Sequence, residues 1–144
     1  MIGPFDGEYR FLSNFYVPNN GVFFEGICYP TAEHAFQAAK TLDISKRIRM
    51  TTIGTAAEAK SFGKTLSLQK NWENIKLEIM RQIVLDKFSR NTSIGEKLIA
   101  TGSERLAEIN TWKDRFWGVY NGTGENHLGK ILMSVRNILQ KKGI

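Results

Sequence analysis

The sequence contains very little cysteine and lacks long apolar runs. Its one cysteine, Cys28, cannot form an internal disulfide, and a reducing cytoplasm is the simplest compartment for such a chain. No apolar run is long enough to span a bilayer, and the opening MIGPFDGEYR has neither the basic nor the apolar part of a secretory signal. Internal repeats, low-complexity tracts and linkers are lacking too. We therefore expect one cytoplasmic domain over residues 1–144, with no membrane partner.

Ligand sets for metals and cofactors are also missing from the sequence. The two histidines and Cys28 lie far apart without metal-ligand spacing, so we expect neither a metal site nor thiol catalysis. The segment from Gly124 to Lys130 matches a Walker loop until Ile131, which stands where that loop needs Ser or Thr. A dinucleotide fingerprint would need a third glycine. We expect no cofactor, and the segment predicts only a generic anion site at the backbone N–H groups where the last helix begins.

Positive charge is in excess, because 20 Lys and Arg against 14 Asp and Glu give a net charge of +6. Such an excess favours anionic partners, namely phosphates, nucleotides or nucleic acid. The basic residues are dispersed, and the small clusters SKRIR and QKKG do not form a basic tail. A protein that only binds nucleic acid would be expected to show a denser basic stripe.

The order of strand-like and helix-like segments predicts the fold class. GVFFEGICY, residues 21–29, is aromatic and β-branched between turn residues, which indicates a strand or hairpin. Helical periodicity dominates after Pro30, with Thr31 and Thr55 as N-caps. Predicted helices cover residues 31–41, 44–50, 55–63, 71–91, 93–101 and 126–143, and predicted strands cover residues 105–110 and 115–120. The pattern predicts a predominantly helical α+β domain whose small sheet combines the N-terminal part with the region near Trp117.

The stretch YPTAEHAFQAAK places Glu33 and His34 in the first turn of a predicted helix. In a structural interpretation, Glu33 is there because the helix macrodipole favours a carboxylate by about 0.3–1 kcal/mol. In a functional interpretation, the same dipole keeps the carboxylate ionised, as a base or a stabiliser of positive charge must be. Gln37 and Lys40 share the face of Glu33. His34 points about 100° away from Glu33 and ranks below it as a substrate-binding candidate, because a lone histidine is more often structural.

A second group of candidate residues lies in RFLSNFY. Ser13 and Asn14 commonly form turns in such a setting, which needs no function. With Arg10, Phe15 and Tyr16 beside them, the same residues would suit a nucleotide pocket. There an aromatic ring stacks on a base, an amide reads the edge of the base, and the guanidinium holds a phosphate.

The stretch NTWKDRFWG brackets Asp114 with Trp112 and Trp117. Tryptophans usually belong to the core. A carboxylate between two of them is less usual, because burial disfavours the charged form of a carboxylate that lacks hydrogen bonds. Asp114 is therefore a candidate acid, base or ligand of a ribose hydroxyl.

Seven motifs occur in a fixed order and together make the chain recognisable. They are FLSNFY, YPTAEHAFQAAK, AKSFGK, NWENIKLEIMRQIVLDKFSRN, LIATGSERLAEI, DRFWG and GTGENHLGKILMSVR. From about Phe5 to Leu139 the chain closely resembles the NADAR family, also called YbiA-like proteins. The resemblance implies a small, mostly helical α+β domain with N-glycosidase activity and no metal requirement.

The resemblance also implies roles for individual residues. Glu33 and Asp114 become the catalytic candidates. Pocket residues are implied at Trp72, Trp117 with its neighbour Gly118, and Asn126. In the resulting hypothesis Trp117 and Phe15 or Tyr16 stack the base, Asn14 and Asn126 orient polar edges, and Arg10 and the start of the last helix hold phosphate.

The family resemblance narrows the substrate to a ribose whose C1 is bonded to nitrogen. Characterised relatives cleave phosphorylated intermediates of riboflavin biosynthesis, and others remove ADP-ribose from guanine in nucleic acid. We expect activity on ADP-ribosylated guanine in DNA or RNA, with the riboflavin intermediates or a non-catalytic ADP-ribose sensor as alternatives. Cleavage passes through an oxocarbenium-like state that a carboxylate stabilises. Glu33 would stabilise that centre or activate the attacking water, and Asp114 would contact the ribose hydroxyls. The roles of the two carboxylates could also be exchanged. The oligomeric state stays open.

Overall fold

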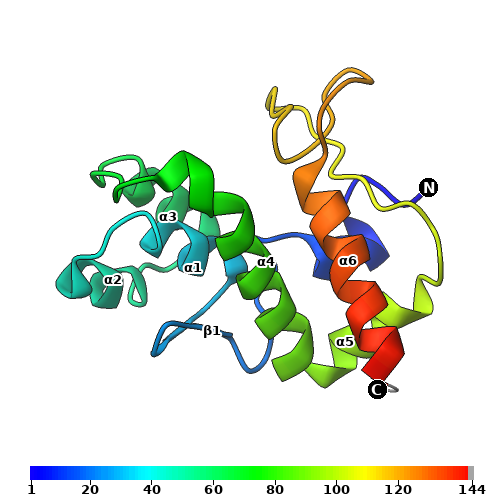
Figure 1. Cartoon of the computed structure of the whole chain (residues 1–144), viewed down its shortest axis with the longest axis horizontal. Helices are drawn as coiled ribbons and strands as arrows, with labels where there is room; N and C mark the ends of the chain where they lie inside the picture. Colours follow the sequence, from blue (N-terminus) through cyan, green and yellow to red (C-terminus); the bar gives the residue numbers. More distant parts are fainter. Residues whose placement is uncertain (143–144) are drawn as a thin grey trace. The chain divides into compact units, whose positions relative to one another are not determined.

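The computed structural model describes residues 1–142, which divide into two compact units (Figure 1). The central unit is Asn14–Asn91, and the terminal unit combines Met1–Ser13 with the chain from Thr92 onward. The single domain expected over residues 1–144 stays a prediction, and its last two residues lie outside the described part. None of the helices within residues 1–142 has the length and apolarity that crossing a membrane requires.

The central unit begins with a β-hairpin, as its sequence predicts. β1 (Val22–Phe24) pairs antiparallel with β2 (Ile27–Tyr29), with Phe23 opposite Cys28. The two turn residues between them, Glu25 and Gly26, have φ values of 45° and 89°. A two-residue hairpin loop with positive φ at both positions matches the right-handed twist of the strands.

Three short helices follow the hairpin, each started by a side-chain cap. α1 (Ala32–Ala38) is capped by Thr31, whose side chain accepts from the His34 N–H. α2 (Ile44–Met50) is capped by Asp43, and α3 (Ala56–Gly63) by Thr55. α1 contacts α2, α3 and the hairpin, and all of its residues are buried. Its end falls short of the predicted Thr41, because the last turn tightens into i to i+3 hydrogen bonds.

The long helix α4 (Trp72–Arg90) completes the central unit and confirms the strongest periodic prediction. One face buries Trp72, Met80, Ile83, Val84, Lys87 and Phe88. This face packs against α1 and β1, and the ring of Trp72 lies 5.2 Å from that of Phe36, centroid to centroid. Buried Asn91 accepts from the Asn20 N–H at 2.7 Å and donates to Gly21 O at 2.9 Å. The end of α4 is thereby tied to the start of the hairpin.

The terminal unit is built on a pair of helices that lie side by side in Figure 1. They are α5 (Thr92–Ala100) and α6 (His127–Lys142), preceded at the start of the chain by the 3-10 helix η1 (Gly7–Leu12). The apolar stripe of α6 at Leu132, Val135 and Leu139 is at most 1% exposed. The predicted closing helix is confirmed as far as Lys142, while its predicted last residue, Gly143, lies outside the described part. Burial of the stripe means that it packs internally.

The strands predicted at residues 105–110 and 115–120 are wrong. These segments form isolated bridges, Ile2 with Leu106 and Ile109 with Val119, and the sheet described within residues 1–142 consists of β1 and β2. A β-ladder cannot extend through the second segment, because its backbone groups already form hydrogen bonds with the Asp114 side chain and the start of α6. Asp114 accepts from two N–H groups of the second segment, and α6 donates to its carbonyls. The small sheet therefore does not include the region near Trp117.

Candidate active site

Glu33 is the centre of the best-organised polar group in the central unit. It lies in the first turn of α1, is 8% exposed, and its backbone N–H donates to Asn14 O at 3.0 Å. Its carboxylate Oε2 accepts from Gln37 Nε2 at 2.5 Å. The capping of α1 is done by Thr31 and by Asn14 O, so the helix does not need the Glu33 carboxylate for that purpose.

Gln37 supports Glu33 from one turn further along α1. Its side chain is 5% exposed, and its Oε1 has no hydrogen-bond partner among the described residues. Gly63 of α3 packs against this amide so closely that a Cβ there would collide with it. A buried acceptor without a partner is costly unless a ligand or water satisfies it. Gln37 therefore orients Glu33, while its buried Oε1 lies against Gly63.

Lys40 carries the positive charge of this face. Burial lowers the pKa of its ammonium, the charge of Glu33 raises it, and the charges of three further lysines lower it. Those lysines are Lys60, Lys64 and Lys76. Glu33 and Lys40 therefore lie within electrostatic reach of one another, although Lys40 lies just beyond the end of α1.

Asn14 and Phe15 lie at the start of the central unit. Asn14 O holds the first turn of α1, and its Nδ2 lies 3.5 Å from Met80 Sδ on α4. Phe15 is 38% exposed. Tyr16 packs its ring under the Lys87 ammonium at 5.8 Å. The structure thus places the predicted Asn14 next to the Glu33 turn, and leaves much of the Phe15 ring at the surface.

His34 is engaged by the protein itself. It is 1% exposed, with Nδ1 2.7 Å from Thr31 Oγ1 and Nε2 2.9 Å from Ile53 O. Burial lowers the pKa of the imidazole. Because both ring nitrogens have internal partners, we assign His34 to the support of α1 rather than to substrate contact. Trp72, 5% exposed and packed on Phe36, is likewise a packing residue of this unit.

In the terminal unit, Asp114 organises a turn. Its Oδ1 accepts from the N–H groups of Phe116 at 3.0 Å and Trp117 at 2.9 Å. Its own backbone is held at both ends by the amide of buried Asn110. The carboxylate therefore sets the position of Trp117, whose ring meets that of Phe116 edge-on at 4.9 Å.

Two further predicted residues of the terminal unit have structural contacts. Gly118 lies so close to Glu108 O that a Cβ could not fit. Asn126, 1% exposed, accepts from the Glu108 N–H and donates to Leu106 O, both at 3.0 Å. Both polar ends of the Asn126 amide thus have partners within the protein. Arg10 of η1 is exposed, and Ser13 is half-buried.

The anion site expected at the start of α6 is wrong. The N–H groups of Glu125, His127 and Leu128 donate to the carbonyls of residues 115–117 at 2.7–3.1 Å. These are the groups that would have faced an anion. The turn organised by Asp114 satisfies them instead.

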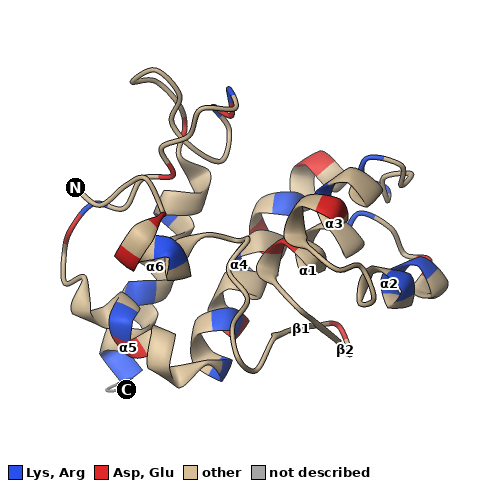
Figure 2. Ribbon diagram, turned by 180° about the vertical axis from the view of Figure 1, so that it is seen from behind, with Lys and Arg blue, Asp and Glu red and all other residues tan. Residues whose placement is uncertain are grey.

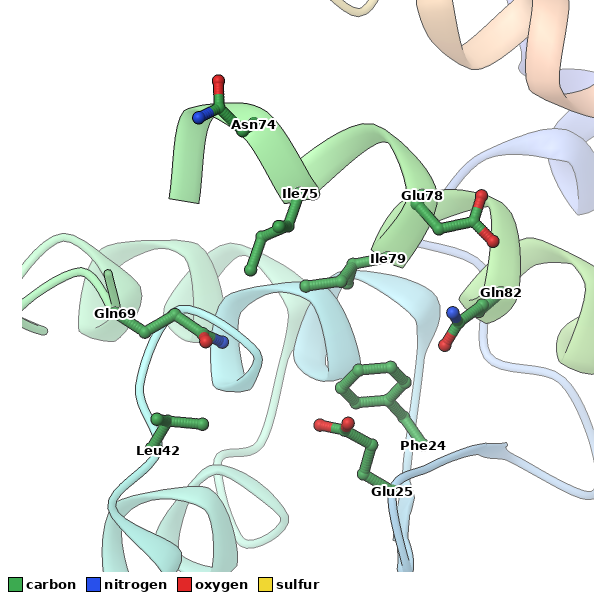
Figure 3. Close-up of a pocket in the computed structure, with 9 residues that line it drawn as sticks. All are labelled: Phe24, Glu25, Leu42, Gln69, Asn74, Ile75, Glu78, Ile79 and Gln82. Atoms are coloured by element: carbon green, nitrogen blue, oxygen red, sulfur yellow. The ribbon is translucent and has the colours of Figure 1, made fainter. Parts of the chain in front are cut away.

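A pocket of about 320 Å³ lies in the central unit, on another face of α4 (Figure 3). Its lining residues are Phe24, Glu25, Leu42, Gln69, Asn74, Ile75, Glu78, Ile79 and Gln82. In Figure 3, Phe24 and Glu25 of the hairpin point towards Ile79. Arg47 and Arg81 pair with the two carboxylates of the lining, at 2.9 and 2.8 Å. Both carboxylates of this lining are thus already paired, and the lining includes neither Glu33 nor Gln37, so we take the group around Glu33 as the candidate site.

Sequence reasoning missed Gly63 and the lysines that surround Lys40. The Lys60–Lys64 spacing in AKSFGK, one helical turn, was the available signal for two of them. Their approach to α1 depends on how α1 and α3 pack, and periodicity does not specify this.

Comparisons with known proteins identify the family and the fold. A family model described as NADAR domain matches residues 3–140. A Nostoc punctiforme protein named N-glycosidase is 39% identical over 146 residues, covering 94% of this chain and 92% of its own. A Vibrio vulnificus protein named riboflavin biosynthesis protein is 38% identical over 139 residues. That match covers 94% of this chain but only 37% of the longer protein.

The NMR structure of the E. coli protein YbiA matches with a TM-score of 0.84 and 32% identity, covering 99% of this chain and 84% of that one. This match confirms the predominantly helical α+β fold.

Proposed function

The chain belongs to the NADAR domain family, and we propose that it is an N-glycosidase that hydrolyses the bond between a ribose C1 and a nitrogen. The observation that carries the proposal is the Glu33 carboxylate, nearly buried and held by Gln37 in the first turn of α1. A fixed carboxylate of this kind is what a reaction with a developing positive charge at C1 needs.

The chemistry requires a group that stabilises charge and a group that accepts a proton. As the C1–N bond breaks, its electron pair leaves with the nitrogen, and C1 becomes oxocarbenium-like. Water then bonds to C1, and a carboxylate takes the proton that the water loses and passes it to the departing nitrogen, which leaves protonated. We assign both tasks to Glu33, which Gln37 Nε2 orients.

Asp114 and Trp117 keep the roles implied by the family resemblance as predictions. The hydrogen bonds of Asp114 Oδ1 show how Asp114 sets the backbone that carries Trp117. Loss of Asp114 would therefore disturb the Trp117 ring, whether or not Asp114 itself meets the substrate. The proposal rests on the central unit, where Glu33, Gln37 and Lys40 are placed together.

For the substrate, we propose guanine that carries ADP-ribose in DNA or RNA. The net charge of +6 supports a partner with a phosphate backbone. The second candidate is a phosphorylated intermediate of riboflavin biosynthesis, and a specific observation favours it: the Vibrio vulnificus relative is named a riboflavin biosynthesis protein. Both candidates share a ribose C1–N bond and nearby phosphate.

The test compares the purified protein with Glu33→Gln, which keeps the size of the side chain and removes its charge. We expect the wild type to release ADP-ribose from guanine-ADP-ribosylated DNA, and Glu33→Gln to be slower by about 10²-fold or more. Glu96→Gln, an exposed glutamate of α5, is the matched control and should keep wild-type activity. Mass spectrometry follows the products, and circular dichroism confirms that each variant is folded.

Each other outcome has a definite meaning. Full activity of folded Glu33→Gln would overturn the catalytic role of Glu33. Turnover of the riboflavin intermediates alone would replace the first substrate by the second. Binding of ADP-ribose without turnover of either substrate would contradict an enzyme and indicate a sensor.

A further inference from the structure

Four lysines of the central unit gather where three helices end or begin. Lys40 follows the last turn of α1, Lys60 and Lys64 lie one turn apart at the end of α3, and Lys76 is in the second turn of α4. α1 contacts both α3 and α4. Gln69, just before α4, holds the end of α1 by donating to Ala39 O and Lys40 O at 2.7 and 2.6 Å. We call Lys40, Lys60, Lys64 and Lys76 the lysine cluster.

Within the lysine cluster, the charged form of Lys40 is disfavoured. Burial lowers the pKa of its ammonium, and repulsion by the charges of Lys60, Lys64 and Lys76 lowers it further. Two carboxylates act against this repulsion: Glu33 attracts Lys40, and Glu73 pairs with Lys76 at 2.6 Å. Four ammonium groups and these two carboxylates leave an excess of two positive charges. A phosphate or diphosphate group of two negative charges would balance that excess.

The cluster is also in the right place for the phosphate of a ribosyl substrate. Gly63, which directly precedes Lys64, packs against the Gln37 amide that holds Glu33, so a ligand phosphate at the lysines lies near the proposed catalytic carboxylate. The alternative phosphate site expected from the sequence, at the start of α6, is blocked because its N–H groups have carbonyl partners. Lysine ammonium groups bind phosphate as point charges and tolerate several geometries.

From this arrangement we propose that the lysine cluster is the phosphate subsite of the enzyme. The proposal rests on the proposed function for the position of the C1–N bond. The binding of phosphate itself does not depend on that function and is tested separately.

The binding test uses inorganic pyrophosphate as the probe, titrated into the full chain and followed by calorimetry. Lys60→Gln/Lys64→Gln removes the two members of the cluster that lie at the end of α3. Lys46→Gln/Lys70→Gln is the matched control: it removes the same charge from exposed lysines of the same unit that are not among those acting on Lys40. We expect the cluster variant to bind pyrophosphate at least about tenfold more weakly, which is about 1.4 kcal/mol, and the control to bind like the wild type. Lys60→Arg/Lys64→Arg should restore binding.

Equal weakening by both charge-removing variants would overturn the subsite and indicate a general charge effect. Absence of pyrophosphate binding by the wild type would overturn it as well.

In the activity assay, the cluster variant should raise KM about tenfold with kcat within about threefold, because it removes binding common to substrate and transition state. Unchanged KM would overturn the subsite and leave the N-glycosidase proposal standing. Lysine-dependent pyrophosphate binding without turnover of any candidate would support the subsite and contradict the proposed function.

Discussion

At the scale of single residues, the direction of the proposed catalytic carboxylate depends on an amide and a glycine. Gln37 Nε2 donates to Glu33 Oε2 at 2.5 Å, and this amide in turn lies against Gly63 of α3. Two helices therefore set the position of one carboxylate. A group that must meet a reacting carbon loses much of its effect when it is displaced by about 1 Å.

Gly63→Ala should consequently reduce activity without touching the carboxylate itself. The added Cβ would collide with the Gln37 amide, which would have to move and release Glu33. We expect kcat to fall by about tenfold or more, and the free energy of unfolding to fall by about 1–3 kcal/mol from overpacking. Steady-state kinetics and urea unfolding measure the two effects.

The matched control for this substitution is Gly54→Ala. A Cβ at Gly54 would meet its nearest neighbour, Glu58 Oε1, at an ordinary 3.5 Å. The control should therefore keep wild-type kcat. If Gly63→Ala is folded and as active as the control, the orientation of Glu33 through Gln37 is wrong.

The sequence predicts part of this arrangement. The four-residue step from Glu33 to Gln37 places both on one face of a helix, and the 2.5 Å hydrogen bond confirms it. The partner of that pair, Gly63, is 26 positions further along the chain than Gln37. Its role depends on the close approach of two helices, and no pattern within a single helix reports such an approach.

At the scale of elements, the start of α1 is the feature on which the site depends. Thr31 Oγ1 accepts from the His34 N–H at 3.1 Å and lies 2.7 Å from His34 Nδ1. One hydroxyl therefore caps the helix and holds a buried imidazole. Since Glu33 lies between these two residues, loosening the cap would also loosen the turn that carries the Glu33 carboxylate.

We expect Thr31→Ala to lower the free energy of unfolding by about 1–2 kcal/mol, the upper part of the usual range for a lost N-cap, because His34 loses a partner as well. Thr31→Ser retains the hydroxyl and should stay within about 0.5 kcal/mol of the wild type. Chemical denaturation of both variants measures the difference. Equal destabilisation by alanine and serine would show that the methyl group, rather than the hydroxyl, supports α1.

Elements that depend on local signals were predictable, and those that depend on remote partners were not. Thr31 and Thr55 cap the helices that the sequence assigns to them, and GVFFEGICY forms the expected hairpin. Residues 115–120 have the aromatic and β-branched composition of a strand. Their carbonyls instead accept from the first N–H groups of α6, and Asp114 takes the N–H groups of Phe116 and Trp117. Strand propensity does not reveal that competition.

At the scale of the whole molecule, charge decides which partners approach. The net charge is +6, and Figure 2 shows basic residues on α2, α5 and α6 as well as on the elements of the lysine cluster. A field of this sign concentrates every anion, small or large, and raises the rate of encounter. Net charge alone therefore does not separate a nucleic-acid substrate from a phosphorylated metabolite. The response to salt does, because only a strand releases condensed counterions from several neighbouring phosphates.

The salt dependence of kcat/KM should therefore identify the substrate. For guanine-ADP-ribosylated duplex DNA we expect log kcat/KM to fall linearly with log salt concentration, with a slope of about −2 or steeper, since each contacted phosphate contributes about −0.9. The matched control is the ADP-ribosylated guanine nucleoside, which presents the same C1–N bond without a strand and should give a clearly shallower slope. Both are measured between about 50 and 200 mM salt, a range in which such contacts alter affinity strongly. Equal slopes would mean that the protein does not contact the strand, which would contradict the nucleic-acid substrate and favour the phosphorylated metabolite.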